Sequence, residues 1–324
     1  MNIFFLKTMR NIYIKLFRPT ISFYNQKRYY NDKEILEGSK ANEIIKNILV
    51  KGAPAMIARF GDSELYCLRH YLAYRETSWK NKLDYIKGGD PVFWDDKSRK
   101  PIFYNAGVFP HSEKMFIAFS EEFKSHLPNI DVLASWLHGE EFFYKNYFPT
   151  ADLVSIFAYE PYFHENPWSK YLAGKKVLVI HPFEKSIQVQ YKKRNLLFKD
   201  PNILPDFELI TYKAVQSIAG NKTQFKDWIE ALKFMVNDIS KIEFDIAIIG
   251  AGAYGLPLTS YVKQMGKIGI HLGGATQILF GIWGSRYDEP RKEAYLKLKN
   301  EHWIRPSEEE RPIGYQTIEG GCYW

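Results

Sequence analysis

Short apolar segments alternate with helical patterns through the second half of the chain, and this alternation limits the fold more than any other feature. Apolar strands are predicted at 177–181, 207–211, 244–249 and 268–272. The clearest helical pattern between them, with Thr223 as its predicted N-cap, has one apolar face made of Phe225, Trp228, Ile229, Leu232, Met235 and Ile239. Strands that alternate with helices predict a mainly parallel sheet. The expected fold class is α/β, a Rossmann-like sheet flanked by helices in a single large domain.

The first half of the chain carries the same pattern less regularly. Its expected strands span 55–58, 132–136 and 153–157, and its expected helices span 32–50, 62–72 and 116–127. Residues 77–110 follow neither pattern, which is typical of a functional loop. We expect three parts: an N-terminal arm at 1–30, a main domain at 31–287, and a C-terminal part at 288–324 with a surface helix and an irregular tail.

Charge and cysteine content narrow the class of protein. The chain of 324 residues has a net charge of +7, which favours an anionic partner. Nucleic acid is not expected, because the sequence has no zinc-ligand pairs, no RNA-binding aromatic motif and no basic heptads. The two cysteines form no disulfide framework, so a reducing, cytoplasmic compartment is expected.

The N-terminal arm combines apolar periodicity with basic charge. Apolar residues recur at three- and four-residue intervals at Phe5, Leu6, Met9, Ile12, Tyr13, Leu16 and Phe17. The basic residues among them are Lys7, Arg10, Lys15 and Arg18, and the first acid is Asp32. This pattern is typical of an amphipathic helix on an anionic membrane surface, and equally of a helix packed on the core or on a partner. A peripheral position on the inner face of the plasma membrane is therefore one expectation.

The segment Arg59-Phe60-Gly61-Asp62-Ser63-Glu64 directly follows the strand predicted at 55–58. It sits at a strand-to-helix turn, where α/β folds bind ligands. Two carboxylates beside an arginine suit a divalent cation that holds a diphosphate. The structural alternative makes Asp62 the N-cap of the next helix, with Glu64 complementing its dipole. The two interpretations are compatible, because helix N-termini also bind phosphates.

Residues 144–168 are dense in aromatic rings. The rings belong to Tyr144, Tyr147, Phe148, Phe157, Tyr159, Tyr162, Phe163 and Trp168. Glu160, His164 and Glu165 lie among them. Rings for the apolar faces of a sugar and carboxylates for its hydroxyls would suit an acceptor site, whereas the structural alternative is a core aromatic cluster.

The segment Gly250-x-Gly252-x-x-Gly255 follows a predicted strand and precedes a helix, as the dinucleotide-binding fingerprint requires. Two features argue against NAD. The motif lies late in the chain, and the next strand ends at His271-Leu272-Gly273-Gly274 without the acid that would bind the ribose. The glycines either let backbone amides approach a phosphate or sugar, or permit tight packing of strand against helix.

Three parts of the sequence together resemble the bacterial glycosyltransferases of the GT-D fold, which act in capsule, glycan and glycoprotein assembly. They are Arg59 to Glu64, Val177 to Phe183, and Gly252 to Pro257 with Ile270 to Gln277. The resemblance covers residues 40–287 and makes 31–287 a GT-D-like catalytic domain. The family commonly has a glycine between the two acids where this chain has Ser63, a change that keeps both carboxylates.

The resemblance implies a metal-dependent hexosyltransferase. Its donor would be a UDP-sugar, and Asp62 and Glu64 would hold Mn²⁺ or Mg²⁺. Its acceptor would be a glycan, a lipid-linked molecule or a glycoprotein in bacterial surface assembly. The expected donor-binding residues are Arg59, Gly61, His181, Lys185, Gly252, Tyr254, His271, Gly273 and Gly274, of which Arg59 and Lys185 add positive charge at the phosphates. Glu160 is the expected base if the reaction inverts configuration.

Two other functions fit parts of the sequence. The glycine loop at 250–255 suits an NAD(P)-binding oxidoreductase. The N-terminal arm suits a non-catalytic scaffold at a membrane surface.

Overall fold

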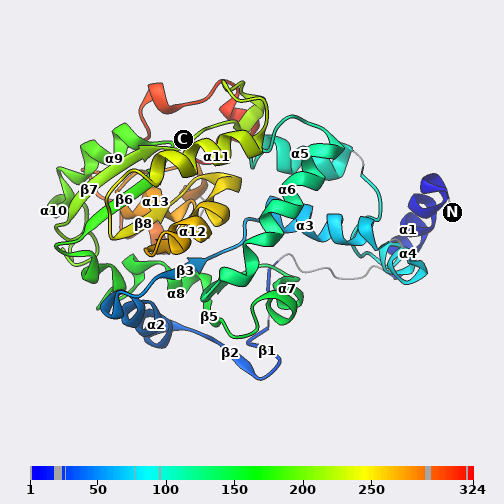
Figure 1. Ribbon diagram of the computed structural model, residues 1–324, viewed down its shortest axis with the longest axis horizontal. Helices are drawn as coiled ribbons and strands as arrows, with labels where there is room; N and C mark the ends of the chain where they lie inside the picture. Colours follow the sequence, from blue (N-terminus) through cyan, green and yellow to red (C-terminus); the bar gives the residue numbers. More distant parts are fainter. Residues whose placement is uncertain are drawn as a thin grey trace.

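The computed structural model describes residues 2–17, 24–25, 27–76, 78–94, 96–288, 293–318 and 320–324. Arg18, expected in the basic arm, lies outside these ranges. The strands are β1 (Tyr29–Tyr30), β2 (Lys33–Leu36), β3 (Ala55–Ala58), β4 (Val132–Ser135), β5 (Asp152–Ser155), β6 (Lys176–His181), β7 (Glu208–Lys213), β8 (Ile246–Ile249) and β9 (Ile268–Ile270). They form one sheet in the order β1-β2-β5-β4-β3-β9-β8-β6-β7 (Figure 1).

Helices surround this sheet. They are α1 (Ile3–Phe17), α2 (Gly38–Lys51), α3 (Asp62–Arg75), α4 (Trp79–Ile86), α5 (Asp96–Tyr104), α6 (Glu113–Ser125), α7 (Glu140–Tyr147), α8 (Ile156–Tyr159), α9 (Glu184–Tyr191), α10 (Arg194–Leu197), α11 (Trp228–Ile239), α12 (Gly255–Gln264), α13 (Ala275–Leu279) and α14 (Glu293–Leu296). Apart from β1, which is antiparallel to β2, every paired strand of the sheet is parallel to its neighbour. The prediction of an α/β fold with a mainly parallel sheet is confirmed.

The sheet separates two hydrophobic cores because side chains alternate along each strand. In β8, Ile246 and Ile248 belong to one core, while Ala247 and Ile249 belong to the other. Helices α3, α6, α11 and α12 cover the face of Ala247 and Ile249. Helices α2, α9 and α13, with parts of the C-terminal tail, cover the opposite face. Both faces are buried, so the central strands are apolar without alternation.

The strand connections leave the sheet on alternate faces near its centre. Helix α3, after β3, and α12, after β8, lie on one face, whereas α13, after β9, and α9, after β6, lie on the other. The loops that follow these adjacent parallel strands therefore run in opposite directions, toward opposite faces of the sheet. In open α/β sheets a crevice forms at such a point and holds the ligand.

Several predicted elements were wrong in detail. The helix expected at 32–50 begins only at Gly38, because Lys33–Leu36 pairs as β2 with β5. The segment 77–110 is not irregular throughout, since it contains α4 and α5. Helix α11 is capped by Asp227, whose side chain accepts the Glu230 amide, and not by Thr223.

The C-terminal part differs from the prediction in the length of its helix. Among its described residues the surface helix expected at 288–299 is reduced to α14, Glu293–Leu296. The tail beyond it is irregular and packed, as expected: Trp303, Ile318 and Trp324 are buried in the core on the α9 face. Across the described residues, every helix falls short of the length and hydropathy that a membrane-spanning segment requires.

Candidate functional site

A cavity of about 850 Å³ opens at the carboxyl ends of β3, β9, β8 and β6. The residues that line it include nearly all of the predicted site: Arg59, Gly61, Asp62, Glu64, Glu160, His181, Gly252, Tyr254, His271, Gly273 and Gly274. Lys185 is the predicted residue that does not line it. The register explains the convergence, because Ile57 pairs with Ile270 and the His271 amide donates to the Ile57 carbonyl at 2.8 Å.

Asp62 and Glu64 occupy the first turn of α3. Gly61 is the N-cap, so the prediction of Asp62 as N-cap was wrong, and Asp62 is the first helical residue. Glu64, two positions on, is 7% exposed. A Cβ built on Gly61 would lie 2.1 Å from Oε2 of Glu64, which shows that this carboxylate folds back over the N-cap residue. A side chain at position 61 would therefore require the Glu64 carboxylate to move from this place.

The acids at the start of α3 meet part of the requirement for a metal ion. Among the described residues, no cluster of three or more His, Cys, Asp or Glu side chains is arranged to hold a metal. Asp62 and Glu64 thus offer two carboxylates and no third protein ligand of these types. Mg²⁺ commonly binds proteins through one or two carboxylates, with phosphate oxygens and water completing its shell. The donor set fits an ion that arrives with a phosphorylated ligand.

Two arginines flank the turn that follows β9. A Cβ on Gly273 would lie 3.4 Å from Cδ of Arg59, and a Cβ on Gly274 would lie 3.0 Å from Nη1 of Arg286. The Arg59 guanidinium lies 4.7 Å above the Trp136 ring, and that of Arg286 lies 4.1 Å above the Tyr323 ring. Stacking on an aromatic face leaves the edge of a guanidinium to donate hydrogen bonds. The turn and the two arginines form a cationic wall of the cavity.

Arg286 was missed by sequence reasoning. It lies 16 residues after the end of β9, beyond helix α13, and no motif marks it. Its place in the site depends on the C-terminal tail, because its backbone amide donates to the Cys322 carbonyl at 3.0 Å. The only sequence feature that could have pointed to Arg286 is its basic charge after the last predicted strand. Arg305 and Arg311 share this feature, so it does not single out Arg286.

His181 ends β6 and His271 directly follows β9, two strands that flank β8, and both side chains are buried. Burial lowers the pKa of His181 to about 3, and its Nδ1 accepts the Phe183 amide at 2.9 Å, which leaves the ring proton on Nε2. Burial also lowers the pKa of His271 to about 3, with the Arg59 charge acting in the same direction. Both rings are neutral at pH 7, so they contribute hydrogen-bonding groups and no positive charge.

Glu160 connects the aromatic segment to the C-terminal part. Its Oε2 accepts hydrogen bonds from the hydroxyls of Tyr162 and Tyr295, each at 2.7 Å. Burial, with the Glu160 charge as the next cause, raises the pKa of Tyr162 well above its usual value. An oxygen that already accepts two phenolic hydrogens is better placed to hold α14 than to abstract a proton. The base role of Glu160 stays a prediction.

Lys185 lies at the surface beside the tail. Its Nζ pairs with Glu309, and the side chain is 66% exposed. Its backbone amide donates to Oε1 of Glu310 at 2.7 Å, and the Ser186 amide donates to the same oxygen at 3.3 Å. The backbone amides at the N-terminus of α9, which could bind an anion, thus already donate to a carboxylate of the chain itself.

The glycines of the 250–255 segment mainly allow close packing. A Cβ on Gly250 would lie 2.6 Å from the Gly273 carbonyl oxygen, and a Cβ on Gly255 would lie 2.2 Å from Nε2 of His271. Tyr254 is buried, and its ring stacks on Trp228 at 5.0 Å. Of these glycines only Gly252, with a φ of +52°, has a backbone conformation that itself favours glycine over other residues. The packing alternative therefore accounts for Gly250 and Gly255.

The N-terminal arm reaches the cavity through Tyr24, which lines it and forms an isolated bridge with Leu137. The next residue, Asn25, donates its amide to the Trp136 carbonyl at 2.8 Å and its side chain to Oγ of Ser135 at 3.1 Å. These contacts hold the arm against the end of β4. They also fix the backbone of Trp136, on whose ring the Arg59 guanidinium stacks.

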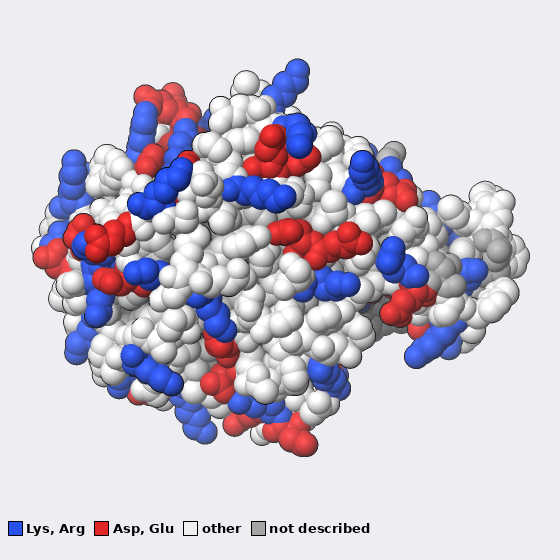
Figure 2. Space-filling view, in the orientation of Figure 1, with Lys and Arg blue, Asp and Glu red and all other residues white. Residues whose placement is uncertain are grey.

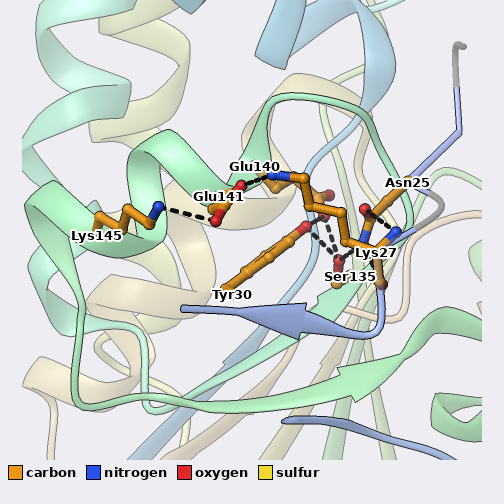
Figure 3. A network of polar contacts seen from close by, with 7 residues as sticks. All are labelled: Asn25, Lys27, Tyr30, Ser135, Glu140, Glu141 and Lys145. Carbon is orange, nitrogen blue, oxygen red and sulfur yellow. Dashed lines mark hydrogen bonds and ion pairs between the residues drawn. The ribbon is translucent and has the colours of Figure 1, made fainter. Parts of the chain in front are cut away.

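A buried carboxyl completes this support (Figure 3). Oε2 of Glu140 accepts from Oγ of Ser135 at 2.7 Å, from the Trp136 amide at 3.0 Å and from the Tyr30 hydroxyl at 3.2 Å. Burial raises the pKa of Glu140 to about 7. Glu141, its neighbour, faces Lys27 and Lys145 instead (Figure 3).

No family model, curated protein or solved structure matches this chain.

Proposed function

We propose that the chain is a glycosyltransferase related to the GT-D fold, which moves a sugar from a UDP-sugar with the help of Mn²⁺ or Mg²⁺. The observation that carries the proposal is the meeting of two kinds of group in one cavity. Asp62 and Glu64 lie at the N-terminus of α3, and Arg59 and Arg286 flank the Gly273-Gly274 turn. Carboxylates for a cation beside arginines for an anion are the groups that a metal diphosphate requires.

The size and position of the cavity agree with such a donor. Small-molecule sites usually enclose about 300–1,000 Å³, and this cavity measures about 850 Å³. It lies where connections leave the sheet on opposite faces, which is the usual ligand position in open α/β folds. Its exposed aromatic wall, with Phe157 65% exposed, suits the apolar face of a sugar ring.

Each residue has a role in this reaction. Breaking the bond between sugar and phosphate places negative charge on the β-phosphate of UDP, and a bound cation would supply Lewis-acid stabilisation there. Asp62 and Glu64 would hold that cation. Arg59 and Arg286 would donate hydrogen bonds to the phosphate oxygens, in geometry prepared by the Trp136 and Tyr323 rings. The neutral His181 and His271 would hydrogen-bond the nucleotide or sugar.

The proposal places the protein in the cytoplasm and its acceptor in surface glycan, lipid-linked or glycoprotein assembly. The two cysteines, Cys67 and Cys322, are both buried free thiols, which suits a reducing compartment.

A hydrolysis screen tests the proposal. The full chain is incubated with a panel of UDP-sugars and Mn²⁺, and UDP release is measured. We expect release from at least one donor, and a loss of about 100-fold in Asp62→Asn, the scale seen when one group that stabilises developing charge is removed. Glu243→Gln is the matched control, because Glu243 is an 83% exposed carboxylate in a surface ion pair. Equal release by Asp62→Asn and the parent would refute the assignment.

A further inference from the structure

Helices α1 and α4 form a lobe at one end of the molecule (Figure 1). The lobe has a small hydrophobic core of its own, made of Leu6, Tyr85, Val92 and Phe93, apart from the two cores of the sheet. The Arg10 guanidinium holds the two helices together, because it donates to the Gly89 and Gly88 carbonyls at 2.7 and 3.2 Å and to the Tyr85 carbonyl. Arg10 thus satisfies the C-terminal end of α4 and is directed into the lobe.

The outer surface of this lobe is unusually apolar. Of the 15 residues of α1, Leu6 alone is buried. The exposed apolar residues on α1 and α4 are Ile3, Phe4, Phe5, Met9, Ile12, Leu16, Phe17, Trp79 and Leu83. They make up nearly half of the exposed large hydrophobic side chains in the described residues. Figure 2 shows the tip of the lobe as mainly uncharged.

Four of these residues form a continuous stripe. Phe5, Met9, Ile12 and Leu16 follow spacings of four, three and four, so they share one face of α1. Leu16 is 70% exposed and Ile12 is 49% exposed. A helix of this length is marginal in water unless an apolar face is buried. The stripe is thus a surface that a partner would complete.

The charges around the stripe favour one kind of partner. Helix α1 has no acidic residue, and Lys15 in its last turn is exposed beside the stripe. On α4, Lys80 is exposed next to Trp79, Asp84 is the exposed acid, and Lys87, also exposed, directly follows the helix. Apolar side chains bordered by lysines match the surface of an anionic bilayer, where acyl chains lie beneath anionic headgroups.

We propose that the α1–α4 lobe docks on an anionic lipid surface, with the stripe of Phe5, Met9, Ile12 and Leu16 inserted between headgroups. Lys15, Lys80 and Lys87 lie at the level of the lipid phosphates. This inference does not depend on the proposed enzymatic activity, since it rests on the surface of a lobe that does not line the cavity.

Vesicle flotation with the full chain tests the proposal. The probes are phosphatidylglycerol–phosphatidylcholine vesicles and pure phosphatidylcholine vesicles. We expect the parent to float with the anionic vesicles, and the double variant Ile12→Glu/Leu16→Glu to lose at least about tenfold in bound fraction. Val50→Glu is the matched control, because Val50 is 62% exposed on α2. It should float like the parent.

A second variant separates charge from apolar contact. Lys15→Glu leaves the stripe intact and should lower binding to the anionic vesicles about tenfold, with recovery as the fraction of anionic lipid rises. Equal flotation of the parent and the double variant would overturn the proposal, as would absence of flotation by the parent. One further outcome would identify a different partner. If the parent does not float but forms a concentration-dependent dimer in lipid-free solution, and the double variant is monomeric, then the stripe binds a second copy of the chain.

Discussion

Glu310 caps helix α9 from 124 residues away: its carboxylate accepts the Ser186 amide at 3.3 Å and the neighbouring Lys185 amide at 2.7 Å. Glu310 is 4% exposed, and it also accepts from the hydroxyl of Ser307 at 3.0 Å. This carboxylate fastens the C-terminal tail, which carries Tyr323 and Trp324 into the cavity wall.

The first prediction concerns this cap. Glu310→Ala should lower the free energy of unfolding by about 1–3 kcal/mol, because it leaves buried amide donors unsatisfied. Chemical denaturation measures the change. Glu309→Ala is the control, since Glu309 is 72% exposed and its pair with Lys185 is at the surface. Equal stability of the two variants would contradict the capping role.

The second prediction concerns Arg286. Arg286→Ala should weaken UDP binding by about 1.5–3 kcal/mol, the usual range for a hydrogen bond to a charged group. Fluorescence-based titration of UDP in the presence of Mn²⁺ measures it. Arg75→Ala, a change at an exposed arginine in the last turn of α3, should bind like the parent. If Arg286→Ala lowers the melting temperature but leaves the affinity for UDP unchanged, Arg286 only packs the tail against the domain and does not bind the ligand.

The third prediction follows from the buried histidines. Their pKa values fall to about 3 in the folded protein, from an ordinary 6.5, so the unfolded chain binds more protons between these values. The free energy of unfolding should therefore decrease as the pH falls below 6.5, by about 1.4 kcal/mol per pH unit for each histidine once it is fully protonated in the unfolded chain. Denaturation between pH 7 and pH 4 checks this, and a smaller slope is expected for His181→Gln. An unchanged slope in that variant would contradict the assignment.

The fourth prediction has the opposite sign. The pKa of Glu140 rises from 4.5 to about 7, so the folded protein binds the proton more tightly than the unfolded chain does. Its contribution to stability is present below pH 4.5 and is lost as the pH rises to about 7. The difference in unfolding free energy between the parent and Glu140→Gln should change steadily across this window. A difference that does not depend on pH would show that the carboxyl is ionised throughout.

The strands of the site were predictable because their information is local. The apolar runs that became β3, β6, β8 and β9 each end at a marked position. Arg59 follows β3, His181 is the last residue of β6, Gly250 follows β8, and His271 follows β9. Parallel pairing then brings those ends to one edge of the sheet, so the convergence of Arg59, His181 and His271 follows from sequence order and strand type.

The wrong predictions concern residues whose structure or role is determined by tertiary contacts. Lys33–Leu36 carries a pattern that also fits a helix, and its pairing with β5 makes it a strand. Lys185 has the right position for a phosphate ligand, but Glu309 and Glu310 bind it from the tail. Arg286 enters the cavity through backbone contacts with Cys322. Each of these contacts joins segments far apart in the sequence, and no local pattern encodes it.

The most direct test of the central claim is calorimetric titration of UDP into the protein, with and without Mn²⁺, in the parent and in Asp62→Asn. The account predicts binding that requires Mn²⁺ in the parent and a loss of at least about tenfold in affinity in the variant, equivalent to about 1.4 kcal/mol. Glu243→Gln should match the parent. UDP binding that is equally strong without Mn²⁺, and equal in Asp62→Asn, would contradict the claim that these acids hold a metal diphosphate.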